Sequence, residues 1–87
     1  MNYYVYMLKS KSIKPITYVG YTVNLKKRIS QHNSGKGAKF TRGRKWMLIY
    51  KETYKSKNKA ISREYYIKKN RALRNKLKNE NLNTITL

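Results

Sequence analysis

Residues 17–35 read TYVGYTVNLKKRISQHNSG, and this stretch decides the fold prediction. Its β-branched and aromatic beginning predicts a strand at residues 16–21. Residues 3–8, YYVYML, predict an earlier strand, and the short loop between the two returns the chain as an antiparallel hairpin. Gly20 interrupts the second strand, where a bulge or a close approach of the backbone is expected.

The same stretch continues into a basic amphipathic helix at about residues 23–33. Thr22 can cap the N-terminus of this helix, and Gly35 provides a C-terminal stop. Leu25 and Ile29 lie one turn apart and form its buried side. The second strand therefore leads through a Gly-Tyr-Thr turn directly into a helix.

The rest of the chain predicts a loop, a strand and two helices. The loop at residues 34–45, SGKGAKFTRGRK, has three glycines and five cations, which suits contact between main-chain N–H groups and a phosphate backbone. After it we expect a strand at 45–54, a helix from Ser56 or Asn58 to about Lys69, and a helix at 71–80 with Leu73 and Leu77 inward.

The element order ββαβαα predicts an α+β fold, a small three-stranded antiparallel sheet flanked by helices. With 87 residues, the chain is expected to form a single domain over 1–87, with a flexible tail from about residue 81. A chain of this length has no room for a second core or a large internal cavity. Its function must therefore lie on or near the surface.

The composition is strongly basic. The net charge is +19, from 22 Lys and Arg against three glutamates, with no aspartate. A bias toward AT-rich codons increases Lys, Asn, Ile and Tyr, but it does not remove acidic residues. The shortage of acids therefore indicates a polyanionic partner, and nucleic acid is favoured over its rival, an anionic membrane surface.

Several functional classes are excluded by what the sequence lacks. The longest apolar run, WMLIY, is too short to span a bilayer, and no signal peptide is visible, so we expect a cytoplasmic protein. Without cysteine and with one histidine, the chain can form no disulfide, thiolate site or His-rich zinc site. A metal would be held mainly by oxygen, which favours one Mg²⁺ or Mn²⁺ ion.

Six short motifs follow one another along the chain in a recognisable order. They are YVY at 4–6, YVG at 18–20, RISQHNSG at 28–35, GAKFT at 37–41, LIYKET at 48–53 and REYYIKK at 63–69. Together they resemble the GIY-YIG nuclease superfamily, in particular its small stand-alone bacterial members, which are similar to the nuclease domain of structure-specific endonucleases. The resemblance covers residues 3 to about 77. Tyr4 departs from the signature, whose first glycine is missing here.

Tyr6 and Tyr18 lie on adjacent predicted strands, and the hairpin can place both hydroxyls on one face. Position alone favours two half-buried strand aromatics with satisfied hydroxyls. The resemblance implies instead that Tyr6 lies beside the attacking water and that Tyr18 supports it or the phosphate. Because free tyrosine has a pKa near 10, a general-base role requires neighbouring cations or metal-bound water to favour the phenolate.

Arg28 and His32 are spaced i and i+4 and share one side of the predicted helix. Arginine can bind two phosphate oxygens at once and stays charged, which suits transition-state stabilisation. His32 can be the base, assist Tyr6 or hold phosphate, and the alternative is a helix C-terminal histidine favoured by the dipole. The resemblance favours a catalytic pair.

Glu64 is the carboxylate expected to carry function. Ala60, Glu64 and Ile67 fall on the inward side of their helix, so the acid is either paired, for example with Lys68, or bound to a metal. The resemblance makes Glu64 the protein ligand of a single divalent ion whose other sites are filled by water and substrate oxygens. Glu52 is interpreted as structural.

We therefore expect a metal-dependent DNA endonuclease, a hydrolase of the kind used in DNA repair. It should recognise the shape of branched or nicked DNA rather than sequence, and a protein partner could supply further specificity; no membrane or small-molecule cofactor is expected. The alternative is a non-catalytic basic nucleic-acid-binding module. The predicted contacts to the DNA backbone are Lys36, Lys39, Arg42, Arg44, Lys68 and Lys69.

Overall fold

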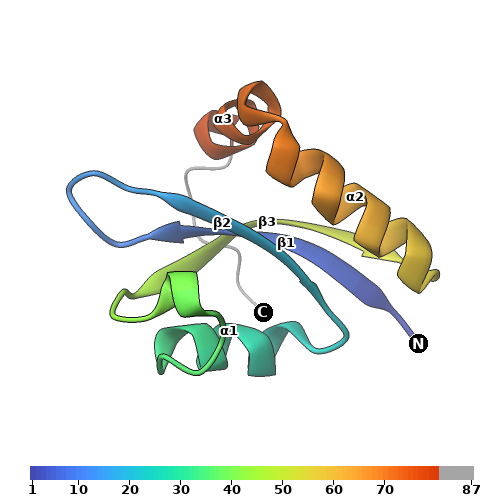
Figure 1. The fold of residues 1–87 in the computed structure, drawn as a ribbon, viewed down its shortest axis with the longest axis horizontal. Coiled ribbons are helices and arrows are strands. Elements are labelled where there is room, and N and C mark those ends of the chain that lie inside the picture. Colours follow the sequence, from blue (N-terminus) through green and yellow to red (C-terminus); the bar gives the residue numbers. More distant parts are fainter. Residues whose placement is uncertain (81–87) are drawn as a thin grey trace.

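The computed structural model describes residues 1–80, and the predicted tail from residue 81 lies outside the described part of the chain. Three strands form one antiparallel sheet in the order β2-β1-β3. The strands are β1 (Tyr3–Ser10), β2 (Thr17–Thr22) and β3 (Trp46–Tyr54). The predicted hairpin and third strand are therefore confirmed, with β1 at the centre of the sheet and β2 at one edge (Figure 1).

Helices cover both faces of this sheet (Figure 1). They are α1 (Leu25–Asn33), α2 (Lys57–Lys69) and α3 (Arg71–Glu80), and a short 3-10 turn at Lys39–Thr41 follows α1. Helix α1 packs on one face, and α2 and α3 pack on the other. The order ββαβαα and the α+β class are those that the sequence predicts.

The alternation of side chains along the strands divides the core into two layers. Val5, Met7 and Ile49 point toward α2 and α3, where they meet Ala60 and Ile67. Tyr6, Leu8, Leu25, Trp46 and Leu48 form the layer beneath α1, with Tyr18 and Ile29 packed against it. Because successive strand residues face opposite sides, Tyr6 and Tyr18 share the α1 face.

The helix ends differ in one respect from the prediction. Helix α1 is capped by Asn24, whose side chain accepts from the N–H of Lys27 at 3.1 Å, and not by Thr22. The Thr22 hydroxyl instead accepts from the N–H of Asn24 at 3.2 Å, so it orders the turn before the cap. Of the two candidates for α2, Ser56 is the cap.

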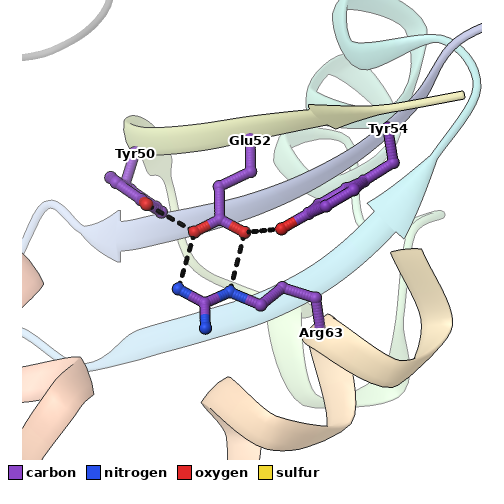
Figure 2. Close-up of polar contacts among 4 residues, drawn as sticks. All are labelled: Tyr50, Glu52, Tyr54 and Arg63. Atoms are coloured by element: carbon purple, nitrogen blue, oxygen red, sulfur yellow. Dashed lines mark hydrogen bonds and ion pairs between the residues drawn. The ribbon is translucent and has the colours of Figure 1, made fainter. Parts of the chain in front are cut away.

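A four-residue polar cluster fastens α2 to the sheet (Figure 2). Tyr50, Glu52 and Tyr54 project from the same face of β3, and both tyrosine hydroxyls donate to the Glu52 carboxylate. Arg63 of α2 donates to the two carboxylate oxygens from Nε and Nη2, at 2.8 and 2.9 Å. The forked pair fixes α2 above β3, so Glu52 has the structural role expected of it.

The environment of Glu52 predicts that the folded protein loses stability at acidic pH. Burial disfavours its charge, but the hydrogen bonds from Arg63, Tyr50 and Tyr54 outweigh burial and hold the pKa of Glu52 below its usual value. Stabilisation by Glu52 is complete above the unfolded pKa of about 4.5 and is lost as pH falls through the lower folded value. Glu52→Gln should lower the free energy of unfolding at pH 7 by about 1–3 kcal/mol.

Urea unfolding at pH 7, 5, 4 and 3 measures this difference. The difference in unfolding free energy between wild type and Glu52→Gln should narrow below about pH 4.5, because the wild-type carboxyl is protonated there first in the unfolded chain and, at lower pH, in the folded protein. Glu80→Gln at the exposed end of α3 is the matched control and should have almost no effect at any pH. A difference in unfolding free energy that stays constant down to pH 3 would contradict the stabilising role assigned to the Glu52 carboxylate.

Candidate active site

A buried hydrogen bond joins the sheet to α1. The Tyr6 hydroxyl lies 2.7 Å from Nε2 of His32, and both side chains are at most 1% exposed. The other imidazole nitrogen, Nδ1, lies 2.9 Å from Oγ1 of Thr41 in the 3-10 turn. Both ring nitrogens of the only histidine therefore have partners within the protein.

Thr41 determines which imidazole nitrogen carries the proton. Its hydroxyl donates to the carbonyl of Ala38 at 2.9 Å, and it accepts from the N–H of Ala38 at 3.2 Å. A hydroxyl has a single proton, and with that proton on the Ala38 carbonyl we assign the donor of the bond to His32 as Nδ1–H. Nε2 is then unprotonated and accepts the hydrogen bond from Tyr6.

Trp46 holds this turn in place. Its indole Nε1–H donates to the carbonyl of Thr41 at 3.0 Å, and the side chain is only 2% exposed. The backbone N–H of Trp46 donates to the side chain of Asn33, at the end of α1, at 2.6 Å. The start of β3, the end of α1 and the 3-10 turn are thus joined around His32.

Two glycines leave the space that the Tyr6–His32 pair occupies. Gly20 lies opposite Tyr6 in the β1–β2 register, and a methyl group at Gly20 would stand 2.5 Å from the Tyr6 hydroxyl. A methyl group at Gly37 would stand 2.3 Å from Nδ1 of His32. Gly20 is therefore a close approach of backbone to side chain, and the register irregularity of the sheet lies instead between Met7 and Leu8.

The environment keeps both partners neutral. Burial raises the pKa of the Tyr6 phenol to about 12; the Arg28 guanidinium opposes this rise, and Tyr18 and Glu64 add to it. Burial, helped by the positive charge of Arg28, lowers the pKa of His32 to about 4. Arg28 alone therefore does not favour a phenolate at Tyr6, because desolvation outweighs its charge.

Arg28 brings a cation to this pair from the same helix as His32. Its Nε is buried and has no hydrogen-bond partner within residues 1–80, while Nη1 makes a long contact of 3.5 Å with Gln31. Buried polar atoms are nearly always paired, so an unpaired guanidinium nitrogen beside Tyr6 is suited to an acceptor that arrives from outside, such as a phosphate oxygen.

Tyr18 covers the Tyr6–His32 pair on the side of β2. Its ring centroid lies 6.4 Å from that of Tyr6 and 5.0 Å from the imidazole of His32. The ring of Phe40 stacks on Tyr18 at 6.1 Å, and the ammonium of Lys68 lies 5.7 Å from the Tyr18 centroid. Tyr18 is half-buried, whereas Phe40 is 58% exposed, so this side of the cluster faces solvent.

Glu64 lies on the other side of the sheet from Tyr6 and His32. It lies on α2, which covers the other face of the sheet, and its carboxylate is paired with Lys68 at 3.4 Å. The same Lys68 lies over Tyr18, and the charge of Glu64 contributes to the raised pKa of Tyr6. Lys68 therefore lies between Glu64 and the Tyr18 ring, and the Glu64 charge is within electrostatic range of Tyr6.

Within residues 1–80, no three His, Cys, Asp or Glu side chains are grouped to hold a metal ion. His32 cannot be a ligand in this arrangement, because both of its nitrogens are occupied. Glu64 offers one carboxylate as a hard oxygen donor, and its side chain is 18% exposed. This donor fits a Mg²⁺-like ion, which keeps several waters and needs one or two carboxylates together with substrate oxygens.

A shallow hollow of about 290 Å³ adjoins Tyr18 at the β2 edge, and Lys68 and Arg74 lie among its lining residues. All six cations predicted to contact DNA are exposed: Lys36, Lys39, Arg42, Arg44, Lys68 and Lys69. The GAKFT motif predicts no packing role for Gly37, Phe40 or Thr41. Their part depends on contact with His32 and Tyr18, which local sequence patterns do not reveal.

Comparison with known proteins gives consistent matches. The family model described as the GIY-YIG catalytic domain matches residues 2–79. A UPF0213 protein of Clostridium perfringens is 55% identical over 67 residues, 76% of this chain and 70% of the relative. The UPF0213 protein YazA of Bacillus subtilis is 44% identical over 69 residues, 78% of this chain and 68% of the relative.

A solved structure has a similar fold. The solution NMR structure of a UPF0213 protein from Bacillus halodurans matches with a TM-score of 0.53 and 42% sequence identity. The match covers 88% of this chain and 82% of the other.

Gly20→Ala tests the close approach to Tyr6. The added methyl group overlaps the phenol, so we expect a loss of about 1–3 kcal/mol in the free energy of unfolding. Part of this overlap is with the hydroxyl oxygen, so Gly20→Ala should cost less in a Tyr6→Phe background. Denaturant unfolding of the two single variants and the double variant measures this coupling; equal costs in both backgrounds would contradict the packing described.

The His32 environment predicts a fixed tautomer and a low titration point. Nitrogen-15 NMR should detect protonated Nδ1 and unprotonated Nε2 in a ring that stays neutral down to about pH 4. Because the pKa of His32 in the folded protein lies below its ordinary value of 6.5, His32 stabilises the fold fully above pH 6.5, and this contribution is lost as pH falls toward 4.

Thr41→Val removes the acceptor for Nδ1–H and should cost about 1–3 kcal/mol of stability, whereas Thr41→Ser keeps the hydroxyl and should cost less. An Nε2–H tautomer in the wild type, or titration of His32 near pH 6.5, would show that the network is assigned incorrectly.

Proposed function

The chain belongs to the GIY-YIG catalytic domain family, and on this basis we propose that it is a divalent-metal-dependent DNA endonuclease. The proposal is supported by two phenols and a guanidinium that lie near one another, with one carboxylate paired to the lysine that covers the second phenol. These are Tyr6, Tyr18, Arg28 and Glu64, with His32 buried behind Tyr6. Hydrolysis of a phosphodiester needs a proton acceptor, a cation for the phosphoryl oxygens and help for the leaving oxygen.

In this proposal Tyr6 is the group that receives a proton from the attacking water. Its own proton points to Nε2 of His32, so the phenol oxygen keeps lone pairs to accept another. With a pKa of about 12, Tyr6 is almost never a phenolate at neutral pH, and the proton therefore has to pass on to His32 as the water attacks. His32 acts through Tyr6 and does not touch substrate.

Arg28 and Tyr18 would act on the phosphate. The unpaired Nε of Arg28 can donate to a phosphoryl oxygen, and its charge would also offset the negative charge that develops on Tyr6. Tyr6 is buried before substrate binds, so the half-buried Tyr18 and Arg28 side chains have to move aside when a phosphate enters.

Glu64 would hold one Mg²⁺ or Mn²⁺ ion, which would supply charge neutralisation at the phosphate and at the leaving oxygen. Binding of the ion requires Glu64 to exchange its contact with Lys68, which would then be free for the DNA backbone. The exposed cations of the 34–45 loop would bind phosphates without reading bases, which supports selection by DNA structure, such as branched or nicked duplexes.

Cleavage of linear, flapped, junction, nicked and single-stranded DNA with Mg²⁺, Mn²⁺ or chelator tests the function. We expect metal-dependent cleavage of at least one substrate. Tyr6→Phe should reduce the rate by about 100-fold or more, which is the usual contribution of a proton-transfer group. Glu64→Gln should abolish cleavage but leave DNA affinity unchanged or higher, because Lys68 loses its charged partner.

Glu80→Gln is the charge-matched control for Glu64→Gln and should cleave like the wild type. Wild-type activity in Glu64→Gln would reject the assigned site. Salt-dependent binding of DNA by the wild type, without cleavage of any substrate under any metal condition, would favour the second candidate, a non-catalytic nucleic-acid-binding module consistent with the charge of +19.

A further inference from the structure

Helix α2 exposes two neighbouring tyrosines on its outer side. Tyr65 is 49% exposed and Tyr66 is 53% exposed, although Ala60 and Ile67 of the same helix are fully buried. Residues 65 and 66 lie about 100° apart around the helix axis, so the rings emerge as two separate platforms. Neither ring contributes to the sheet core, which leaves their exposure unexplained by folding.

Each platform carries a cation on its ring. The Lys69 ammonium lies 4.6 Å from the ring centroid of Tyr65, and the Arg63 guanidinium lies 5.4 Å from that of Tyr66. Arg63 is held in this position by its forked pair with Glu52. A flat aromatic surface with a positive charge beside it is the combination that binds a nucleobase together with its phosphate.

Tyr66 lines two adjoining open hollows on the surface of α2, and Tyr65 lines one of them. One, of about 460 Å³, lies between Tyr66, Lys59 and Tyr54; the other, of about 510 Å³, lies between Tyr65, Tyr66 and Arg71. Ser62 and Tyr66 line both, so the hollows follow each other along the helix. Among the described residues, no carboxylate lines either hollow.

We propose that this tyrosine face, consisting of Tyr65, Tyr66, Lys69 and Arg71, binds an unpaired strand of DNA. Bases would stack on the two rings, and phosphates would contact the cations. A second copy of the chain is a poor occupant, because each copy carries a net charge of +19. A duplex is also a poor occupant, because its bases are stacked on one another and cannot cover the rings.

The tyrosine face adjoins the candidate active site. Glu64 and Lys68 form one i,i+4 pair next to Tyr18, and Tyr65 and Lys69 form the next such pair, rotated by one residue around α2. An unpaired DNA strand that extends from the β2 edge over α2 would therefore contact Tyr65 before Tyr66. This connection rests on the proposed function, whereas binding of an unpaired strand to α2 does not.

Fluorescence anisotropy with a labelled (dT)15 oligonucleotide and a 15-base-pair duplex tests the face, in chelator so that no cleavage occurs. Tyr65→Leu/Tyr66→Leu keeps apolar helix-forming side chains but removes the rings. We expect its affinity for (dT)15 to fall about 10-fold or more, and its affinity for the duplex to change less than about threefold. Tyr65→Phe/Tyr66→Phe keeps both rings and should bind (dT)15 like the wild type.

Circular dichroism and thermal unfolding check that both double variants are folded. Equal losses for single-stranded and duplex DNA, or unchanged (dT)15 binding in the leucine variant, would overturn the proposal. The proposal would also be overturned if the leucine variant lost binding to anionic phosphatidylserine vesicles but kept its affinity for (dT)15. Because these measurements need no catalysis, they can succeed when the cleavage assay fails, and cleavage can succeed when they fail.

Discussion

The hydrogen bond between Tyr6 and His32 is the contact around which the candidate site is built. It links the central strand to α1 between two fully buried side chains, and it is possible only because Gly20 and Gly37 have no side chains. Thr41 then orients the imidazole, and Trp46 holds Thr41. A neutral phenol is thereby aligned with an unprotonated nitrogen, an arrangement in which a proton can leave the phenol without entering solvent.

The few acidic residues of this basic chain are used in different ways. Glu52 receives four hydrogen bonds and fastens α2 to β3. Glu64 is one residue after the Arg63 that binds Glu52, so it points about 100° further around α2, and its ion-pair partner in the described chain is Lys68. The structural acid thus sets the rotation of the helix, and this rotation determines where the candidate metal ligand points.

Most of the fold could be predicted from the sequence, because the aromatic and apolar run YYVYML and the Ser56 cap are local signals. The Thr22 prediction was wrong because two residues near the helix start can both cap it, and Asn24 is the one whose side chain meets the N–H of Lys27. The burial of His32 and the role of Thr41 could not be predicted, since they depend on how α1 and the 3-10 turn meet the sheet. The raised pKa of Tyr6 has the same origin: sequence shows the nearby cation but not the depth of burial.

The position of Trp46 has a practical consequence. It is the only tryptophan in the chain, and its indole is bonded to the carbonyl of the same threonine that orients His32. Phe40, which stacks on Tyr18, also lies 6.4 Å from the indole ring. Intrinsic fluorescence excited at the red edge of absorption therefore reports from the wall of the site itself, and any ligand that displaces Tyr18 or the 3-10 turn changes the surroundings of this built-in chromophore.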